Sequence, residues 1–211
     1  MNTMNDLVQD AVRPPKPTFA DRASTYAEWV QKLADGGYRR EVCPSAFDEL
    51  ARYCAVARDE KRGLLLLGPC GTGKTLFLTT FLGRCRFLTA HRIAALYSQH
   101  GDCTEFEDAV HGSHHDTLLN SPPRSLIIDD LGTEPIAKHY GQTTEAMELI
   151  LSQRYVHWQK WDVKTFLTTN RAASGLQDRY GRRITDRLSE MCKVVKFEGA
   201  SARTQQERDR T

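Results

Sequence analysis

Apolar residues recur with helical spacing in the first quarter of the chain, which predicts two helices before residue 60. The first stripe consists of Tyr26, Trp29, Val30 and Leu33, and two glycines after it predict its end. The second stripe follows Pro44 and consists of Phe47, Leu50, Ala51, Cys54 and Ala55. The polar segment 1–18 contains three prolines, which predicts a flexible leader, and residues 19–43 are expected to form a short helical extension.

From residue 64 onward, short continuous apolar runs alternate with helical stretches. The predicted strands are residues 64–67, 86–90, 125–129, 163–169 and 194–197, and the predicted helices are 74–83, 91–100 and 143–160. On the longest helix one face carries Met147, Leu151, Tyr155 and Trp158. Continuous apolar runs are typical of strands buried on both faces. Their alternation with helices predicts a three-layer α/β fold around a mostly parallel sheet.

The composition excludes several classes of protein. Of the 211 residues, 40% are hydrophobic and 27% are charged, which is typical of a globular domain. The 29 basic and 27 acidic residues give a net charge of +2, which excludes a polycation but not a local basic patch that binds nucleic acid. No run approaches the roughly 20 apolar residues that a membrane span requires, and the N-terminus lacks a secretory pattern.

Cysteine and histidine spacing gives little support for a metal site. The six cysteines are irregularly spaced and form no C-x-x-C pair, which favours the reduced thiols of a cytoplasmic protein over disulfides or zinc. The histidine-rich stretch 111–115 lies in a polar segment, so a solvated loop is favoured there over a metal site shared with Cys103.

The strongest chemical signal is GPCGTGKT at residues 68–75, which fits G-x-x-x-x-G-K-[ST] between an apolar run and a helix. The glycines allow backbone N–H groups to turn toward a polyphosphate, which the N-terminus of the helix also favours. We expect Lys74 to reach the β- and γ-phosphates of ATP and the Thr75 hydroxyl to bind Mg²⁺. The expected nucleotide contacts are Gly68, Pro69, Cys70, Gly71, Thr72, Gly73, Lys74, Thr75 and Leu76.

Polar residues follow two further predicted strands. SLIIDD places Asp129 and Asp130 at the carboxyl edge of the sheet, where ligands bind in open α/β folds. We assign Asp129 to Mg²⁺ and Asp130 to the attacking water; an acidic turn is the alternative. Asn170 ends the strand that closes with TTN, and its amide can hydrogen-bond the γ-phosphate or the water, although a turn-forming asparagine would look the same.

The segment 179–197 is rich in basic residues. A guanidinium suits a transition state whose charge spreads over phosphoryl oxygens, whereas a solvated basic face explains most of these residues without any chemistry. The residues are Arg179, Arg182, Arg183, Arg187, Lys193 and Lys196.

Four segments follow one another along the chain: GPCGTGKT, LIIDDLGTE, LTTN and RYGRRITDRLSEMCKVVKFEGASAR. In these segments and their order the chain resembles the AAA+ helicase loaders typified by DnaC and DnaI. The IstB transposition ATPases are similar too. The resemblance covers about residues 44–203 and implies a P-loop NTPase core of the AAA+ type. It implies a Walker A loop at residues 68–75, a Walker B pair at Asp129 and Asp130, and a sensor 1 at Asn170.

The same resemblance implies two arginine roles. Arg187 matches the arginine finger that reaches the ATP of a neighbouring subunit, with Arg182 and Arg183 as alternatives, and Arg203 matches a sensor-2-like arginine. Asp130 stands where many AAA+ proteins have glutamate, and a shorter side chain that positions water less well would slow hydrolysis.

The regions around the core also bear on the resemblance. Only 14 residues follow Phe197, so no helical lid domain is expected, and residues 204–211 are expected to form a flexible tail. Before the core, the helix around Trp29 is the candidate helicase-binding segment; packing on the chain's own core is the alternative.

The resemblance implies an ATPase that loads a hexameric, DnaB-like replicative helicase onto single-stranded DNA. It would assemble with ATP into a spiral or filament, and hydrolysis would release the partner. The alternative is a transposition helper that selects target DNA with a transposase. A small-molecule kinase would require a lid, and a nucleotide-binding module without hydrolysis would tolerate substitution of Asp130.

Overall fold

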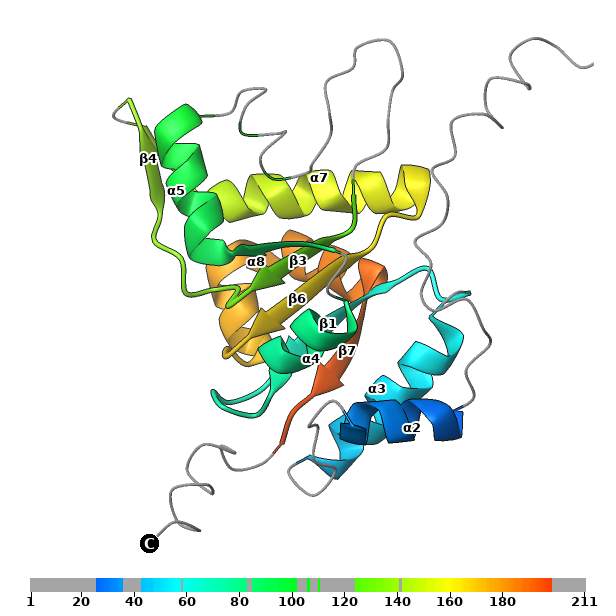
Figure 1. The fold of residues 1–211 in the computed structure, drawn as a ribbon. Coiled ribbons are helices and arrows are strands. Elements are labelled where there is room, and N and C mark those ends of the chain that lie inside the picture. Colours follow the sequence, from blue (N-terminus) through cyan, green and yellow to red (C-terminus); the bar gives the residue numbers. More distant parts are fainter. Residues whose placement is uncertain are drawn as a thin grey trace, which may run out of the picture.

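A five-stranded parallel sheet forms the centre of the molecule, with strand order β2–β3–β6–β1–β7 (Figure 1). The computed structural model describes residues 26–35, 43–57, 59–82, 85–101, 106, 110, 124–140 and 142–198. The strands are β1 (Gly63–Leu67), β2 (Arg86–Thr89), β3 (Leu126–Asp129), β6 (Thr165–Thr169) and β7 (Cys192–Lys196). Helices lie on both faces of the sheet, which confirms the three-layer α/β fold.

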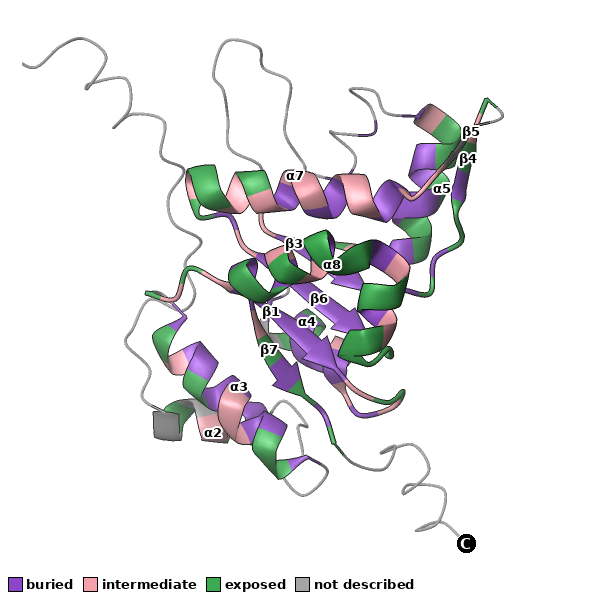
Figure 2. Cartoon of the chain, turned by 180° about the vertical axis from the view of Figure 1, so that it is seen from behind, coloured by how far each residue is buried: buried purple, intermediate pink, exposed green. Residues whose placement is uncertain are grey.

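Successive residues of each strand contact opposite layers. Leu65 and Leu67 pack with the helices α5 (Ala90–His100), α7 (Ala146–Trp161) and α8 (Ala173–Met191). Leu64 and Leu66 pack on the other face with α3 (Pro44–Val56) and α4 (Lys74–Phe81). Because both faces are covered, the central strands are buried along their length, as their continuous apolar runs predict (Figure 2).

The N-terminal helix α2 (Tyr26–Asp35) packs on α3. Leu33 is buried in the same cluster as α3 and α4, and Val30 packs against that cluster. The face of α2 that carries Val30 and Leu33 therefore packs on the chain's own core. Such packing is what the alternative to a helicase-binding helix predicts. The side chains of Tyr26 and Trp29 lie outside the described residues.

A two-stranded hairpin, β4 (Ala137–His139) and β5 (Gln142–Thr144), lies between β3 and α7. The prediction of a helix from residue 143 was wrong at its start, because residues 143–144 pair with β4 instead. Contacts with α5 stabilise the hairpin: the Lys138 N–H donates to Ser98 Oγ at 3.2 Å, and the His139 ring lies 3.2 Å from the Ser98 carbonyl oxygen.

The helix α8 is kinked at Gly181, where φ is 74°. A Cβ atom added there would meet nothing within 4 Å, so the glycine serves the backbone conformation and not close packing. The kink separates a first half, which contains Arg179 and Tyr180, from a second half that carries Arg182, Arg183 and Arg187.

Several predictions fall on residues whose structure is not described. Leader residues 1–18, tail residues 204–211, Arg203, Cys103 and the histidines of 111–115 all lie outside the described ranges. The five cysteines within those ranges are free thiols. Among the helices of the described residues, none combines the length and the apolar character that crossing a bilayer demands.

Candidate active site

The glycine-rich segment between β1 and α4 forms a loop at the carboxyl edge of the sheet. Gly71 and Gly73 have φ of 78° and 91°, in the region that side chains rarely adopt. At Gly68, an added Cβ would lie 2.3 Å from the carbonyl oxygen of Phe197. The glycines of the motif are therefore required by the path of the backbone, as the sequence predicts.

Lys74 begins α4 and folds back over this loop. Its ammonium group donates to the carbonyl oxygens of Gly68 at 2.7 Å and Pro69 at 2.6 Å, and the residue is only 5% exposed. Burial lowers the pKa of Lys74, against an opposing effect of Cys70, Asp130 and Asp129. The ammonium group also lies 3.5 Å from the Thr72 hydroxyl, so its hydrogen-bond partners in the loop are all neutral. A buried ammonium group with neutral partners has a strong preference for an anionic ligand.

Thr75 and Asp129 meet beside Lys74. The Thr75 hydroxyl donates to Oδ1 of Asp129 at 2.8 Å, and the Thr168 hydroxyl donates to the same oxygen at 2.6 Å. Hydroxyl and carboxylate oxygens are the ligands that Mg²⁺ prefers, and two protein oxygens leave its other positions to phosphate and water. The pair therefore fits Mg²⁺. Across the described ranges, no group of three His, Cys, Asp or Glu side chains offers another metal site.

Asp130 and Asn170 face each other across the neighbouring strands β3 and β6. The Asn170 amide lies 3.5 Å from Oδ1 of Asp130, and the Asp130 N–H donates to Thr168 Oγ1 at 2.9 Å. Asp130 adopts a left-handed conformation with φ of 57°. The structure therefore gathers Lys74 and Thr75 with Asp129, Asp130 and Asn170 at the carboxyl edge of the sheet. A phosphate group and a water molecule can be held there.

The structure adds Thr168, which the sequence reasoning did not single out. Its hydroxyl donates to Asp129 and accepts from the Asp130 N–H, so one side chain orients both acidic residues. Thr168 belongs to the TTN motif. Because successive side chains of a strand point to opposite faces, Thr168 and Thr169 point to opposite sides of β6, and this alternation is the sequence signal that distinguishes them.

The arginines of α8 lie in different surroundings. Arg187 donates to Ser152 Oγ at 3.0 Å, and its guanidinium lies 5.2 Å from the centre of the Tyr155 ring, so it packs on α7 of its own chain. Arg182 is 84% exposed, with an ion pair of 3.6 Å to Asp186, and Arg183 is exposed as well. The choice of arginine finger among these three stays a prediction.

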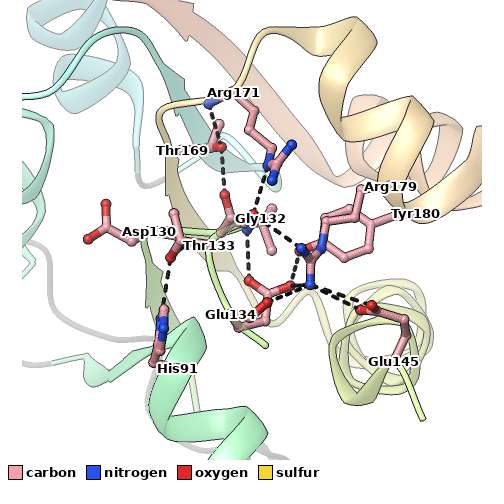
Figure 3. A network of polar contacts seen from close by, with 11 residues as sticks. His91, Asp130, Gly132, Thr133, Glu134, Glu145, Thr169, Arg171, Arg179 and Tyr180 are labelled. Atoms are coloured by element: carbon pink, nitrogen blue, oxygen red, sulfur yellow. Dashed lines mark hydrogen bonds and ion pairs between the residues drawn. The ribbon is translucent and has the colours of Figure 1, made fainter. Parts of the chain in front are cut away.

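Arg179 belongs to a buried polar network that the sequence did not predict (Figure 3). The network centres on Glu134, which is 3% exposed and accepts from the Tyr180 hydroxyl and from the Gly132 N–H. Arg179 lies 3.1 Å from the Glu134 carboxylate and 3.4 Å from that of Glu145. The LGTE motif contains Glu134, but the sequence does not show which way its side chain points.

The sheet order, the glycine loop and the two carboxylates together define a P-loop ATPase core of the AAA+ class. A family model described as IstB-like ATP binding protein matches residues 22–210, nearly the whole chain. The chain belongs to this family of ATP-binding proteins, to which the DnaC-type AAA+ proteins are related.

Solved structures show the same fold. The crystal structure of the DnaC helicase loader has a TM-score of 0.53 and 19% sequence identity, covering 72% of this chain and 90% of that chain. The crystal structure of a DNA replication initiation factor has a TM-score of 0.55 and 16% identity, covering 78% of this chain and 49% of that one. No curated protein sequence matches the chain.

Proposed function

We propose that the chain is an ATP-dependent loader that places a hexameric, DnaB-like replicative helicase onto single-stranded DNA in the cytoplasm. ATP binding and hydrolysis between subunits would act as the assembly switch. The observation that carries the proposal is the 2.8 Å contact of Thr75 with Asp129 beside the buried ammonium group of Lys74. In an ATP-binding family, this contact supports Thr75 and Asp129 as the ligands of Mg²⁺ and Lys74 as the phosphate-binding lysine.

Each residue of the site has a distinct role in this proposal. Backbone N–H groups of residues 68–75 and the Lys74 ammonium group hold the phosphates, and Lys74 exchanges its loop carbonyls for phosphate oxygens. Thr75 and Asp129 hold Mg²⁺, which supplies positive charge to the phosphate oxygens when it is bound. Asp130 and Asn170 orient the water that attacks the γ-phosphate.

The second half of α8 supplies the contact between subunits. The resemblance implies Arg187 as the finger, but Arg187 would have to leave Ser152 and Tyr155 to reach another chain. Arg182 and Arg183 are already exposed on the same half of the helix. Because one ATP then contacts two chains, ATP favours the assembled state, and loss of the γ-phosphate favours release.

The shared fold and the family model each support a different partner protein. The fold shared with the DnaC helicase loader over 90% of that chain supports a helicase partner. Single-stranded DNA follows from the loader role that the resemblance implies. The IstB-like family model supports the second candidate, a transposition helper that selects target DNA with a transposase. A loader acts on single strands, whereas a target selector binds and deforms duplex DNA.

The test uses the purified chain and the replicative helicase of the same genome. With ATP, the chain should retain the helicase in a pull-down and transfer it to circular single-stranded DNA. Omission of ATP, or the Lys74→Ala variant, should abolish the transfer. If the folded, ATP-bound chain neither binds the helicase nor transfers it, the loader proposal fails. Preferential binding of duplex DNA together with a transposase would then establish the second candidate.

A further inference from the structure

The turn that follows β3 has every backbone polar group bonded from Asp130 to Gly132. The Asp130 N–H donates to Thr168 Oγ1 and its carbonyl accepts from the Thr133 N–H at 3.2 Å. The Leu131 N–H donates to the Thr168 carbonyl at 2.8 Å, and its own carbonyl accepts from Thr169 Oγ1 at 2.7 Å. These bonds fix Asp130 in a left-handed conformation that costs free energy and persists only where the surroundings enforce it.

Gly132 completes the turn through side chains from outside the sheet (Figure 3). Its carbonyl accepts from Arg171 Nε at 2.7 Å and from Arg179 Nη1 at 3.4 Å. Its N–H donates to Oε2 of Glu134 at 2.9 Å. Because φ of Gly132 is 93° and an added Cβ would lie 2.6 Å from Arg171 Cδ, this position also requires glycine.

Glu134 uses both of its carboxylate oxygens. While Oε2 accepts from Gly132, Oε1 accepts from the Tyr180 hydroxyl and lies 3.1 Å from Arg179 Nη2. Burial and the Glu134 carboxylate raise the pKa of Tyr180 well above its ordinary value, so its hydroxyl stays protonated and donates. A buried carboxylate is tolerated because it is paired with a cation and fully hydrogen-bonded.

The partners of Glu134 lie at a particular place in α8. Arg179 and Tyr180 immediately precede the kink at Gly181, beyond which the helix carries Arg182, Arg183 and Arg187. Arg179 also donates to the Glu134 carbonyl oxygen at 2.6 Å. The turn that presents Asp130 and the first half of α8 are therefore joined by one buried set of contacts.

We propose that Glu134 is a positioning residue for ATP hydrolysis, which holds Asp130 in its working geometry through Gly132 and ties that turn to α8 through Tyr180 and Arg179. The proposal rests on the ATPase function proposed above. Glu134 acts through the turn: its carboxylate bonds are to Gly132, Tyr180 and Arg179, while Asp130 faces Asn170. Nucleotide binding by the loop and by Lys74 is expected not to depend on it.

The Glu134→Gln variant tests this role. Glutamine keeps the shape but has one acceptor oxygen and one amide donor, so either the Gly132 N–H or the Arg179 guanidinium meets another donor. We expect kcat for ATP to fall by about 10- to 100-fold, since small displacements of a catalytic group have effects of this size. The dissociation constant of a fluorescent ATP analogue and the KM should stay within about twofold of the parent values.

Tyr180→Phe and the double variant give a second, milder test. The phenylalanine variant removes one donor and leaves Gly132 and Arg179 on the carboxylate, so its kcat should fall less than that of Glu134→Gln. In the double variant the two effects should be less than additive, because both substitutions break one network. Fully additive effects would mean that the two residues act separately, which would overturn the proposal.

Thr165→Val provides a matched control. Thr165 is buried at the opposite end of β6, where its hydroxyl accepts from Arg154 Nε at 2.8 Å. This variant should lower the melting temperature and leave kcat unchanged. If the parent is active and Glu134→Gln behaves like Thr165→Val, the positioning role is overturned while the ATPase function stands. If the parent itself does not turn over ATP, the proposed function fails and this inference fails with it.

Discussion

The ammonium group of Lys74 donates a hydrogen bond of 2.6 Å to the carbonyl oxygen of Pro69, inside the loop that surrounds it. Since this cation is the group that would bind the phosphates, Lys74→Ala should abolish ATP binding and every ATP-dependent activity. Isothermal titration calorimetry measures the loss directly. Lys138→Ala, which removes an exposed lysine from β4, should bind ATP normally. Normal ATP affinity in Lys74→Ala would contradict the phosphate-loop assignment.

The same burial predicts a pH dependence. Burial lowers the pKa of Lys74 below its ordinary value of 10.5. Between the lowered pKa and 10.5, the folded chain therefore binds fewer protons than the unfolded chain, and this residue makes the nucleotide-free chain more stable as pH rises. ATP binding requires the charged lysine, so ATP affinity should fall over the same window, with proton uptake on binding. Titrations in buffers of different ionisation enthalpy measure this uptake. Affinity independent of pH throughout the window would refute the prediction.

Thr168→Val should lower the stability of the folded chain. The variant leaves Asp129 with one donor fewer and the half-buried N–H of Asp130 without its acceptor. The expected loss in unfolding free energy is about 1–3 kcal/mol, measured by urea denaturation. Thr185→Val, which removes a hydroxyl bonded only to carbonyls of its own helix, should have a much smaller effect. Equal losses in the two variants would count against a special role of Thr168.

Asp130→Asn should separate binding from hydrolysis. The amide retains the size of the side chain and loses its negative charge, so ATP should still bind while release of phosphate falls by about two orders of magnitude or more. Phosphate release and ATP affinity are measured on the same preparation. Turnover at the parent rate would show that Asp130 does not orient the water, and would favour a nucleotide-binding module.

An arginine finger acts on the neighbouring subunit, so its loss should be rescued in mixtures. Arg182→Ala, Arg183→Ala and Arg187→Ala should each bind ATP as isolated chains, and the variant that lacks the finger should lose turnover in assemblies. When that variant is mixed with Asp130→Asn, some interfaces combine an intact Asp130 with an intact finger, and part of the activity should return. Absence of rescue at every mixing ratio would exclude a finger acting between subunits.

The strands and the phosphate loop were predictable from the sequence because their signals are local. Apolar runs at 64–67 and 125–129 correspond to β1 and β3, and the glycine motif lies between a strand and a helix as expected. The meeting of Asp130 with Asn170 followed from one general rule, since the carboxyl ends of neighbouring parallel strands share an edge.

The hairpin and the Glu134 network were not predictable because their stability comes from distant partners. Strands β4 and β5 have three residues each and are held by Ser98 of α5, about 40 positions earlier. Tyr180 lies 46 positions after Glu134, and nothing in the spacing of the two residues brings them together. Arg179 belongs to a basic run that suggests a solvated surface, yet the fold places it against two carboxylates.

One backbone position decides how the arginines of this protein are presented. Beyond Gly181, a single uninterrupted stretch of helix carries all three candidates, so the φ and ψ angles of that glycine set the direction of the segment from which they project. Ile184, Leu188 and Met191 of that segment are buried, so the hydrophobic core holds it in the direction that Gly181 sets. A neighbouring molecule that approached this helix would thus meet Arg182 and Arg183 before Arg187, which is held against Ser152 and Tyr155.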